Sequence, residues 1–134
     1  MSEKEAHAAG DRQRASETEM RATMERFSQA WARGNIDALM ALMSDAPVYR
    51  TSGGATFEGR TAVREGFARI CRAADPAALP APPSRLVFFD DQCLSYWTLR
   101  LPGADGELRE VEGIDVIGFD SDGRIRVKDA YRKL

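Results

Sequence analysis

The segment LREVEGIDVIGFDSDGRIRVKDAY, residues 108–131, constrains the fold of this chain more than any other part of it. Two runs of alternating character flank the turn sequence DSDG at 120–123, so we expect strands over 107–119 and 124–132. Side chains alternate between the faces of a strand, and an acid, Asp115, shares its face with Val111, Gly113, Ile117 and Phe119. A carboxylate on an apolar face costs free energy unless a partner compensates it. Asp115 is therefore the first candidate for a functional residue.

Length and composition limit the class of protein. The 134 residues are enough for one domain with its own core, and 43% hydrophobic with 30% charged residues is typical of a globular protein. A net charge of −2 gives no basic surface for nucleic acid. The sequence has no apolar run near the roughly 20 residues of a membrane span and no signal-peptide core, so we expect a cytoplasmic protein that does not bind membranes.

The few histidines and cysteines exclude several kinds of catalytic site. The single histidine, His7, lies in a polar lead-in, which argues against a Ser-His-Asp or Cys-His site and against a multi-histidine metal site. Cys71 and Cys93 have no CxxC spacing and are expected to be free thiols. The DSDG sequence lacks the rest of a calcium loop and is better explained by a hairpin turn. We therefore expect no metal and no cofactor.

Helices are expected in the first half of the chain and strands in the second. Ser16 and Glu19 form a capping-box pattern, and Asn35 is a suitable cap for a second, short helix that ends near Ser44. The expected helices are 17–33, 36–44 and 61–75, and the expected strands are 48–51, 56–58, 85–89, 93–101, 107–119 and 124–132. This order indicates an α+β fold with an antiparallel, curved sheet. We expect a flexible lead-in at 1–16, a single domain at 17–134 and an ordered loop at 77–83.

Three stretches of the chain resemble a known superfamily. AWARGNIDALMALMSDAPVY, FEGRTAVREGF and GIDVIGFDSDGRIRVKDAY are similar to the nuclear transport factor 2-like superfamily, which includes SnoaL-like polyketide cyclases and ketosteroid isomerases. The resemblance covers about residues 20–132. It implies a cone-shaped, cystatin-like fold in which a curved antiparallel sheet wraps around N-terminal helices and encloses a small-molecule pocket.

The resemblance also implies roles for particular residues. The oxyanion-hole acid of the isomerases falls on Asp115, but their oxyanion-hole tyrosine falls on Phe27 and their general base falls on Arg50, so a standard ketosteroid isomerase is not expected. Lys128 and Arg132 fall on cavity-lining positions, and Arg126 shares their parity. The predicted catalytic residue is thus Asp115, and the predicted substrate-binding residues are Phe27, Trp31, Arg50, Phe67, Trp97, Lys128 and Arg132.

Two kinds of function remain open at this point. One is a cofactor-free acid/base enzyme of the cyclase or isomerase type, in which cations at 50, 128 and 132 favour an oxygenated or anionic substrate. The other is a non-catalytic ligand-binding or dimerisation module, with Asp115 as a structural acid paired to Lys128 or Arg50. Ile114 and Val116, with Leu101 extending them, give the opposite face of the long strand an apolar surface, and together with the resemblance they predict a homodimer.

Overall fold

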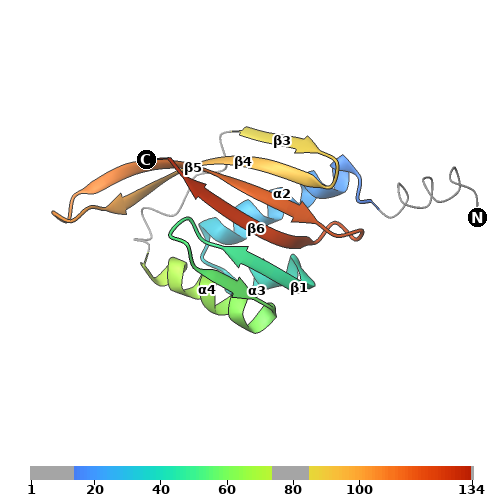
Figure 1. The fold of residues 1–134 in the computed structure, drawn as a ribbon, viewed down its shortest axis with the longest axis horizontal. Helices are drawn as coiled ribbons and strands as arrows, with labels where there is room; N and C mark the ends of the chain where they lie inside the picture. The colour runs from blue at the N-terminus through green and yellow to red at the C-terminus, as the bar shows by residue number, and fades with distance from the viewer. Residues whose placement is uncertain (1–13, 74–84, 134) are drawn as a thin grey trace, which may run out of the picture.

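The fold is seen in a computed structural model that describes residues 14–73 and 85–133 (Figure 1). Within these residues lie the helices α2 (Glu17–Ala32), α3 (Ile36–Ala41) and α4 (Arg60–Ala73). The strands are β1 (Met43–Arg50), β2 (Thr56–Glu58), β3 (Arg85–Phe89), β4 (Gln92–Pro102), β5 (Leu108–Phe119) and β6 (Ile125–Arg132). The loop expected at 77–83 and most of the lead-in expected at 1–16 lie outside the described residues.

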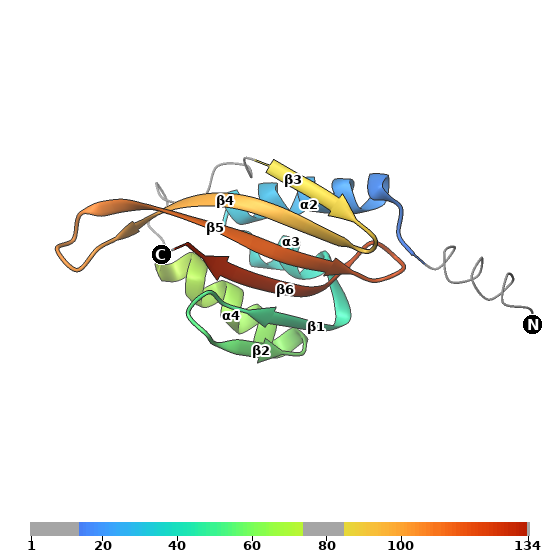
Figure 2. The same ribbon diagram turned by 45° about the horizontal axis from the view of Figure 1, so that its top comes forward.

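The sheet is curved and open, and the helices lie on one side of it (Figures 1 and 2). Its six strands follow the order β2-β1-β6-β5-β4-β3. All neighbours are antiparallel except β1 and β6, which run parallel because the chain passes through α4 and the β3–β5 meander before β6 returns beside β1. The predicted α+β class with a curved sheet around N-terminal helices is confirmed.

Helix α2 forms where the capping pattern predicts it. The Ser16 side chain accepts a hydrogen bond from the Glu19 backbone N–H at 3.1 Å, and the Glu19 carboxylate reaches back to the Ser16 N–H at 3.4 Å. These contacts satisfy backbone donors that the first turn leaves free. One face of the helix is buried under the sheet through Met20, Met24, Phe27 and Trp31. Ala15, which precedes the cap, is already part of the core.

The second helix is shorter than predicted. The sequence pattern extends it to about Ser44, but α3 ends at Ala41 and β1 begins at Met43 rather than at Val48. The cause is a tertiary contact, since the Arg60 guanidinium donates to the carbonyl oxygens of Met40, Met43 and Ser44 at 2.9–3.0 Å. Hydrogen bonds to this side chain replace the next turn of the helix. Met43 remains buried, but as a strand residue.

Strands β4 and β5 continue beyond β6 and β3 as a long twisted hairpin (Figure 2). Their pairing runs without interruption from Gln92↔Gly118 to Pro102↔Leu108. The inward face of β5 carries Val111, Gly113, Asp115, Ile117 and Phe119, all buried, as alternation predicts. The acid therefore does lie on the apolar face of the sheet.

Candidate functional site

A cavity of about 130 Å³ lies between α2 and the inward face of the sheet. Its walls are mainly aromatic and aliphatic, with side chains of Met24, Phe27, Trp31, Tyr49, Trp97 and Leu99. Four hydroxyl residues also border it, namely Ser28, Thr51, Ser52 and Ser95. Asp115 and Lys128 are the only charged residues among the described ones that line it. An apolar cavity with a few converging polar groups is the usual form of a small-molecule site.

Asp115 is almost fully buried, with 7% of its surface exposed, and each carboxylate oxygen has a donor. The Trp97 indole Nε1 donates to Oδ1 at 2.9 Å. The Lys128 ammonium lies 3.4 Å from Oδ2 and forms an ion pair with it. Lys128 is close because β6 pairs with β5, with Ile117 opposite Lys128 and Asp115 opposite Ala130. The acid is thus held by one neutral and one charged donor from the two strands that flank it.

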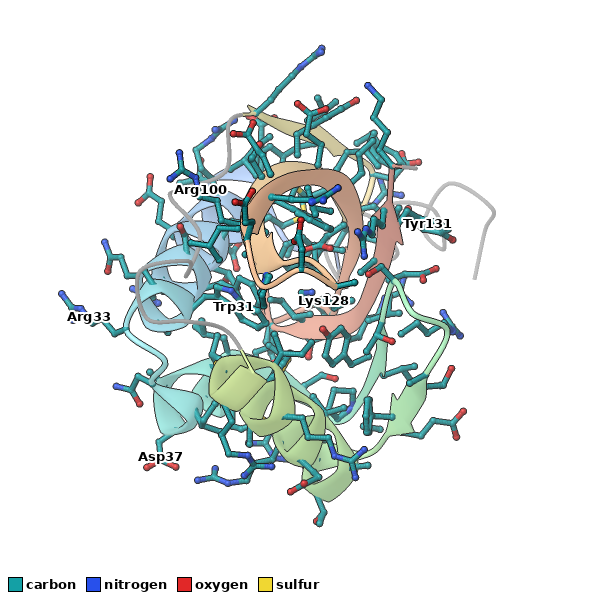
Figure 3. The ribbon with its side chains drawn as sticks, turned by 90° about the vertical axis from the view of Figure 1, so that its left-hand side faces the viewer. Trp31, Arg33, Asp37, Arg100, Lys128 and Tyr131 are labelled. Atoms are coloured by element: carbon teal, nitrogen blue, oxygen red, sulfur yellow. The ribbon has the colours of Figure 1, made fainter. Side chains whose placement is uncertain are left out.

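Lys128 is as buried as its partner and is surrounded by aromatic rings. Its ammonium lies 4.5 Å from the centre of the Tyr49 ring and 5.3 Å from that of the Trp31 ring. Burial is the largest influence on the pKa of Lys128 and lowers it, but the charge of Asp115 and the interactions with Tyr49 together leave the pKa above its ordinary value of 10.5. Figure 3 shows Lys128 and Trp31 pointing into the hollow of the curled sheet. The lysine is therefore a fixed cation at neutral pH.

Tyr49 is a site residue that the sequence analysis missed. It lies on β1 directly beside Lys128 and is 2% exposed. Burial raises the pKa of its hydroxyl above 10.0, while the positive charge of Lys128 opposes the rise, so Tyr49 is a neutral phenol at neutral pH. The sequence did hold a clue to its inward position. Alternation allows only one of the neighbours Tyr49 and Arg50 to face inward, and an aromatic ring suits a core better than a guanidinium.

Trp97 reaches Asp115 because the residue opposite it has no side chain. Gly113 pairs directly with Trp97, and the indole lies across the glycine. A Cβ atom at position 113 would overlap the Trp97 ring, with Cε2 only 2.6 Å away, and would also overlap the carbonyl oxygen of Tyr131. Gly113 thus permits the close approach that brings the indole N–H to the carboxylate.

Ser95 supplies a hydroxyl beside the ion pair. It lies opposite Asp115 on β4, is 5% exposed and borders the cavity. Its hydroxyl makes no hydrogen bond with another residue of the described ranges. A hydroxyl can both donate and accept, so Ser95 can bind a ligand group placed next to Asp115.

Two of the predicted substrate-binding cations lie elsewhere. Arg50 faces the outer side of the sheet, where its guanidinium lies 3.8 Å from the Asp129 carboxylate. Arg132 is exposed at the end of β6 and is not among the residues lining the cavity. Arg126, expected on the same face as Lys128, stands at a register shift, and its side chain bonds Phe119 O at 3.1 Å outside the cavity. Of the four cations that the sequence places near Asp115, Lys128 is the one that lies beside it within the described residues.

The predicted aromatic residues divide into two groups. Phe27, Trp31 and Trp97 line the cavity. Phe67 is fully buried behind it, with its ring edge-on to Trp31 at 5.8 Å and tilted against Tyr49 at 5.0 Å. Phe67 therefore supports the walls, and it is not among the residues that border the cavity.

Two kinds of feature are absent from the part of the chain that the structure describes, a metal-binding cluster and a membrane-spanning helix. No group of three or more histidine, cysteine, aspartate or glutamate side chains there is arranged to hold a metal ion. No helix in residues 14–73 or 85–133 is both long and apolar enough to cross a membrane.

The fold belongs to the nuclear transport factor 2-like, cystatin-like class. A nuclear transport factor 2-like protein of unknown function from Mesorhizobium loti has 22% identity and a TM-score of 0.72, with 87% of this chain and 93% of that one covered. A model of the SnoaL-like domain matches residues 24–127, so the chain belongs to the SnoaL-like family. No curated protein matches it.

Two further solved structures share the fold at low sequence identity. One is SalBIII, an epoxide hydrolase/cyclase-like enzyme with a role in pyran ring formation in the polyether salinomycin, at 16% identity, TM-score 0.75 and coverage of 89% of this chain and 94% of that one. The other is TerC, crystallised with polyporic acid, at 12% identity, TM-score 0.73 and coverage of 86% and 92%. Likeness at this level of identity concerns the fold alone.

Proposed function

We propose that the protein binds a small oxygenated molecule in this cavity and acts on it as a cofactor-free acid/base enzyme of the cyclase or isomerase type, with Asp115 as the catalytic residue. The observation that carries the proposal is the position of the Asp115–Lys128 ion pair, which is buried yet borders an apolar cavity. The SnoaL-like family and its cyclase-like structural neighbour make this class of reaction the natural one to test.

A role in stability alone is a poor explanation for such a pair. Removing two charges from water costs several kcal/mol per ion, and apolar residues of similar volume are often as stable or more stable. Here the side chains of Lys128 and Asp115 are only 6% and 10% exposed. A charged pair kept at the wall of a cavity is therefore a candidate for chemistry.

The arrangement supports proton transfer next to a carbonyl group. The ionised Asp115 accepts a proton from a substrate carbon or hydroxyl, and the electron pair moves to the substrate oxygen or to the bond that forms. The Lys128 ammonium, 3.4 Å from the carboxylate, stabilises the developing oxyanion. Asp115 then returns the proton to another atom of the same substrate. The substrate gains and loses no atoms, so this sequence needs no co-reactant.

A second candidate is a non-catalytic ligand-binding protein on the same fold. Asp115 and Lys128 neutralise each other and Trp97 occupies the other carboxylate oxygen, which is the pattern of a satisfied structural network. In that case the cavity would bind the same kind of molecule without exchanging its protons.

Hydrogen exchange into a carbonyl compound separates the two candidates without knowledge of the natural substrate. We choose 2-acetonaphthone, a neutral aromatic ketone, and follow the loss of its methyl proton signal in D₂O by NMR. The wild type should accelerate exchange over buffer, and Asp115→Asn should lower the acceleration by at least 100-fold because it removes the base. The matched control is Asp129→Asn, an aspartate on the outer face of the sheet that should exchange like the wild type. Binding of the ketone without any acceleration would identify the non-catalytic candidate.

A further inference from the structure

We infer that the cavity selects a flat, electrically neutral ligand and discriminates against carboxylates, with the oxygen of the ligand held by Lys128 and Ser95. The inference rests on the cavity of the proposed function but not on catalysis there. Of the oxygenated or anionic substrate that the sequence suggested, it keeps the oxygenated class and drops the anionic one.

The charge balance of the cavity carries the argument. Among the described lining residues the formal charges are one anion and one cation, 3.4 Å apart. Arg50, which would have supplied a surplus positive charge, is paired with Asp129 on the other face. An incoming carboxylate must therefore give up its water beside the Asp115 carboxylate, and it finds no unneutralised cation among the described lining residues. A neutral ketone or phenol meets neither cost.

The walls favour a planar ring system. Phe27 and Trp31 stack with ring centres 5.8 Å apart and planes at 23°. Tyr49 and Trp97 line the cavity as well, so aromatic surfaces from α2, β1 and β4 converge on it. A volume of about 130 Å³ is comparable to an engineered cavity of about 150 Å³ that binds benzene. It therefore encloses one ring, and the second ring of a naphthalene extends past Ser52, which borders the cavity and is exposed.

Two donors can bind the oxygen of such a ligand. The Ser95 hydroxyl has no partner among the described residues and lies opposite Asp115. The Lys128 ammonium has three N–H donors, and its ion pair with Asp115 at 3.4 Å does not use all of them. A carbonyl or phenol oxygen can accept from both residues without separating the ion pair.

Isothermal titration calorimetry at pH 7 with two probes of nearly the same shape tests the charge preference. The neutral probe is 2-acetonaphthone, and the anionic probe is 2-naphthoate. The wild type should bind the ketone at least tenfold more tightly. Asp115→Asn leaves Lys128 without its counter-ion, so naphthoate should gain at least tenfold in affinity while the affinity for the ketone changes less than threefold. Asp129→Asn, on the outer face, should behave as the wild type.

A second variant keeps the test decisive if Asp115→Asn does not fold. Lys128→Met leaves Asp115 as an unpaired anion, and it should weaken naphthoate binding further than ketone binding. Equal affinity of the wild type for both probes, an unchanged ratio in the variants, or no binding of either probe would each overturn the inference. Failure of proton exchange with the charge preference intact would overturn the enzymatic proposal alone.

Discussion

The energetic coupling between Asp115 and Lys128 can be measured with a double-mutant cycle. At 3.4 Å and an effective dielectric constant of about 20, the Coulomb attraction is about 5 kcal/mol. Removing either partner leaves the other charge buried, so we expect Asp115→Asn and Lys128→Met each to lower the free energy of unfolding by about 3 kcal/mol or more.

The double variant should lose less free energy of unfolding than the sum of the losses in the two single variants. Asparagine at 115 still offers Trp97 an acceptor, and methionine at 128 packs between the Trp31 and Tyr49 rings without a charge. Neither side chain is then a buried, unpaired ion. The coupling free energy should therefore be about 3 kcal/mol, and the double variant should unfold no more readily than the less stable single variant.

Urea unfolding at pH 7, followed by tryptophan fluorescence and circular dichroism, provides the four free energies. The matched control is the exposed pair Arg69–Glu65 on α4, whose ions are 3.3 Å apart. Its cycle should give less than about 1 kcal/mol, because solvent screens exposed pairs. If the buried cycle gives no more than the exposed one, the two charges are not coupled and the reasoning about the site fails.

Three further predictions concern the surroundings of the site. Gly113→Ala should lower the free energy of unfolding in urea by roughly 1–3 kcal/mol and weaken 2-acetonaphthone binding, because the added Cβ displaces Trp97. The control is Gly53→Ala, where an added Cβ has no contact closer than 3.9 Å and should change little. Equal effects of the two substitutions would contradict the close approach of Trp97 to Gly113. Burial raises the pKa of Cys93 from 9.0 to about 11, and the pKa of Lys128 lies above its ordinary 10.5, so the unfolded chain releases these protons at lower pH than the folded one. The contribution of these two groups to the free energy of unfolding should therefore be fully present below pH 9 and decline above it. A flat profile of that free energy in urea between pH 8 and 11 would contradict this. The exposed outer face of the sheet predicts a homodimer, and a light-scattering mass near 14.8 kDa at micromolar concentration would refute it.

The sequence allowed the fold class and the central acid to be predicted because both depend on local rules. The capping box at Ser16 fixes the start of α2, and alternation along 111–119 fixes the face of Asp115. Neither prediction needs knowledge of which strands are neighbours. The order of helices and strands, together with the resemblance to the family, then indicated the curvature of the sheet and a cavity.

The partner of Tyr49 could not be identified from sequence because β1 is irregular. Its register with β6 shifts between Met43 and Val48, and Pro47 lies inside the shift. A proline in a strand removes a ladder hydrogen bond and is compatible with such an irregularity. Counting parity across this point gives no reliable face for Arg50, which leaves the comparison with its neighbour Tyr49 as the only local signal. The resemblance to the family placed Arg50 in the cavity, although it points outward.

A register shift between β5 and β6 likewise explains why Arg126 and Lys128 point to different places. Phe119 pairs with Ile125 and Gly118 with Val127, so Arg126 is an extra residue opposite the β5 ladder. After this bulge the inward positions are Lys128 and Ala130, whereas simple alternation from Ile125 would have placed Lys128 outside. One inserted residue thus turns Arg126 away and brings Lys128 to Asp115, which leaves a single, neutralised pair among the described residues lining the cavity. The charge of the ligand that fits therefore depends on strand register, which composition and periodicity do not determine.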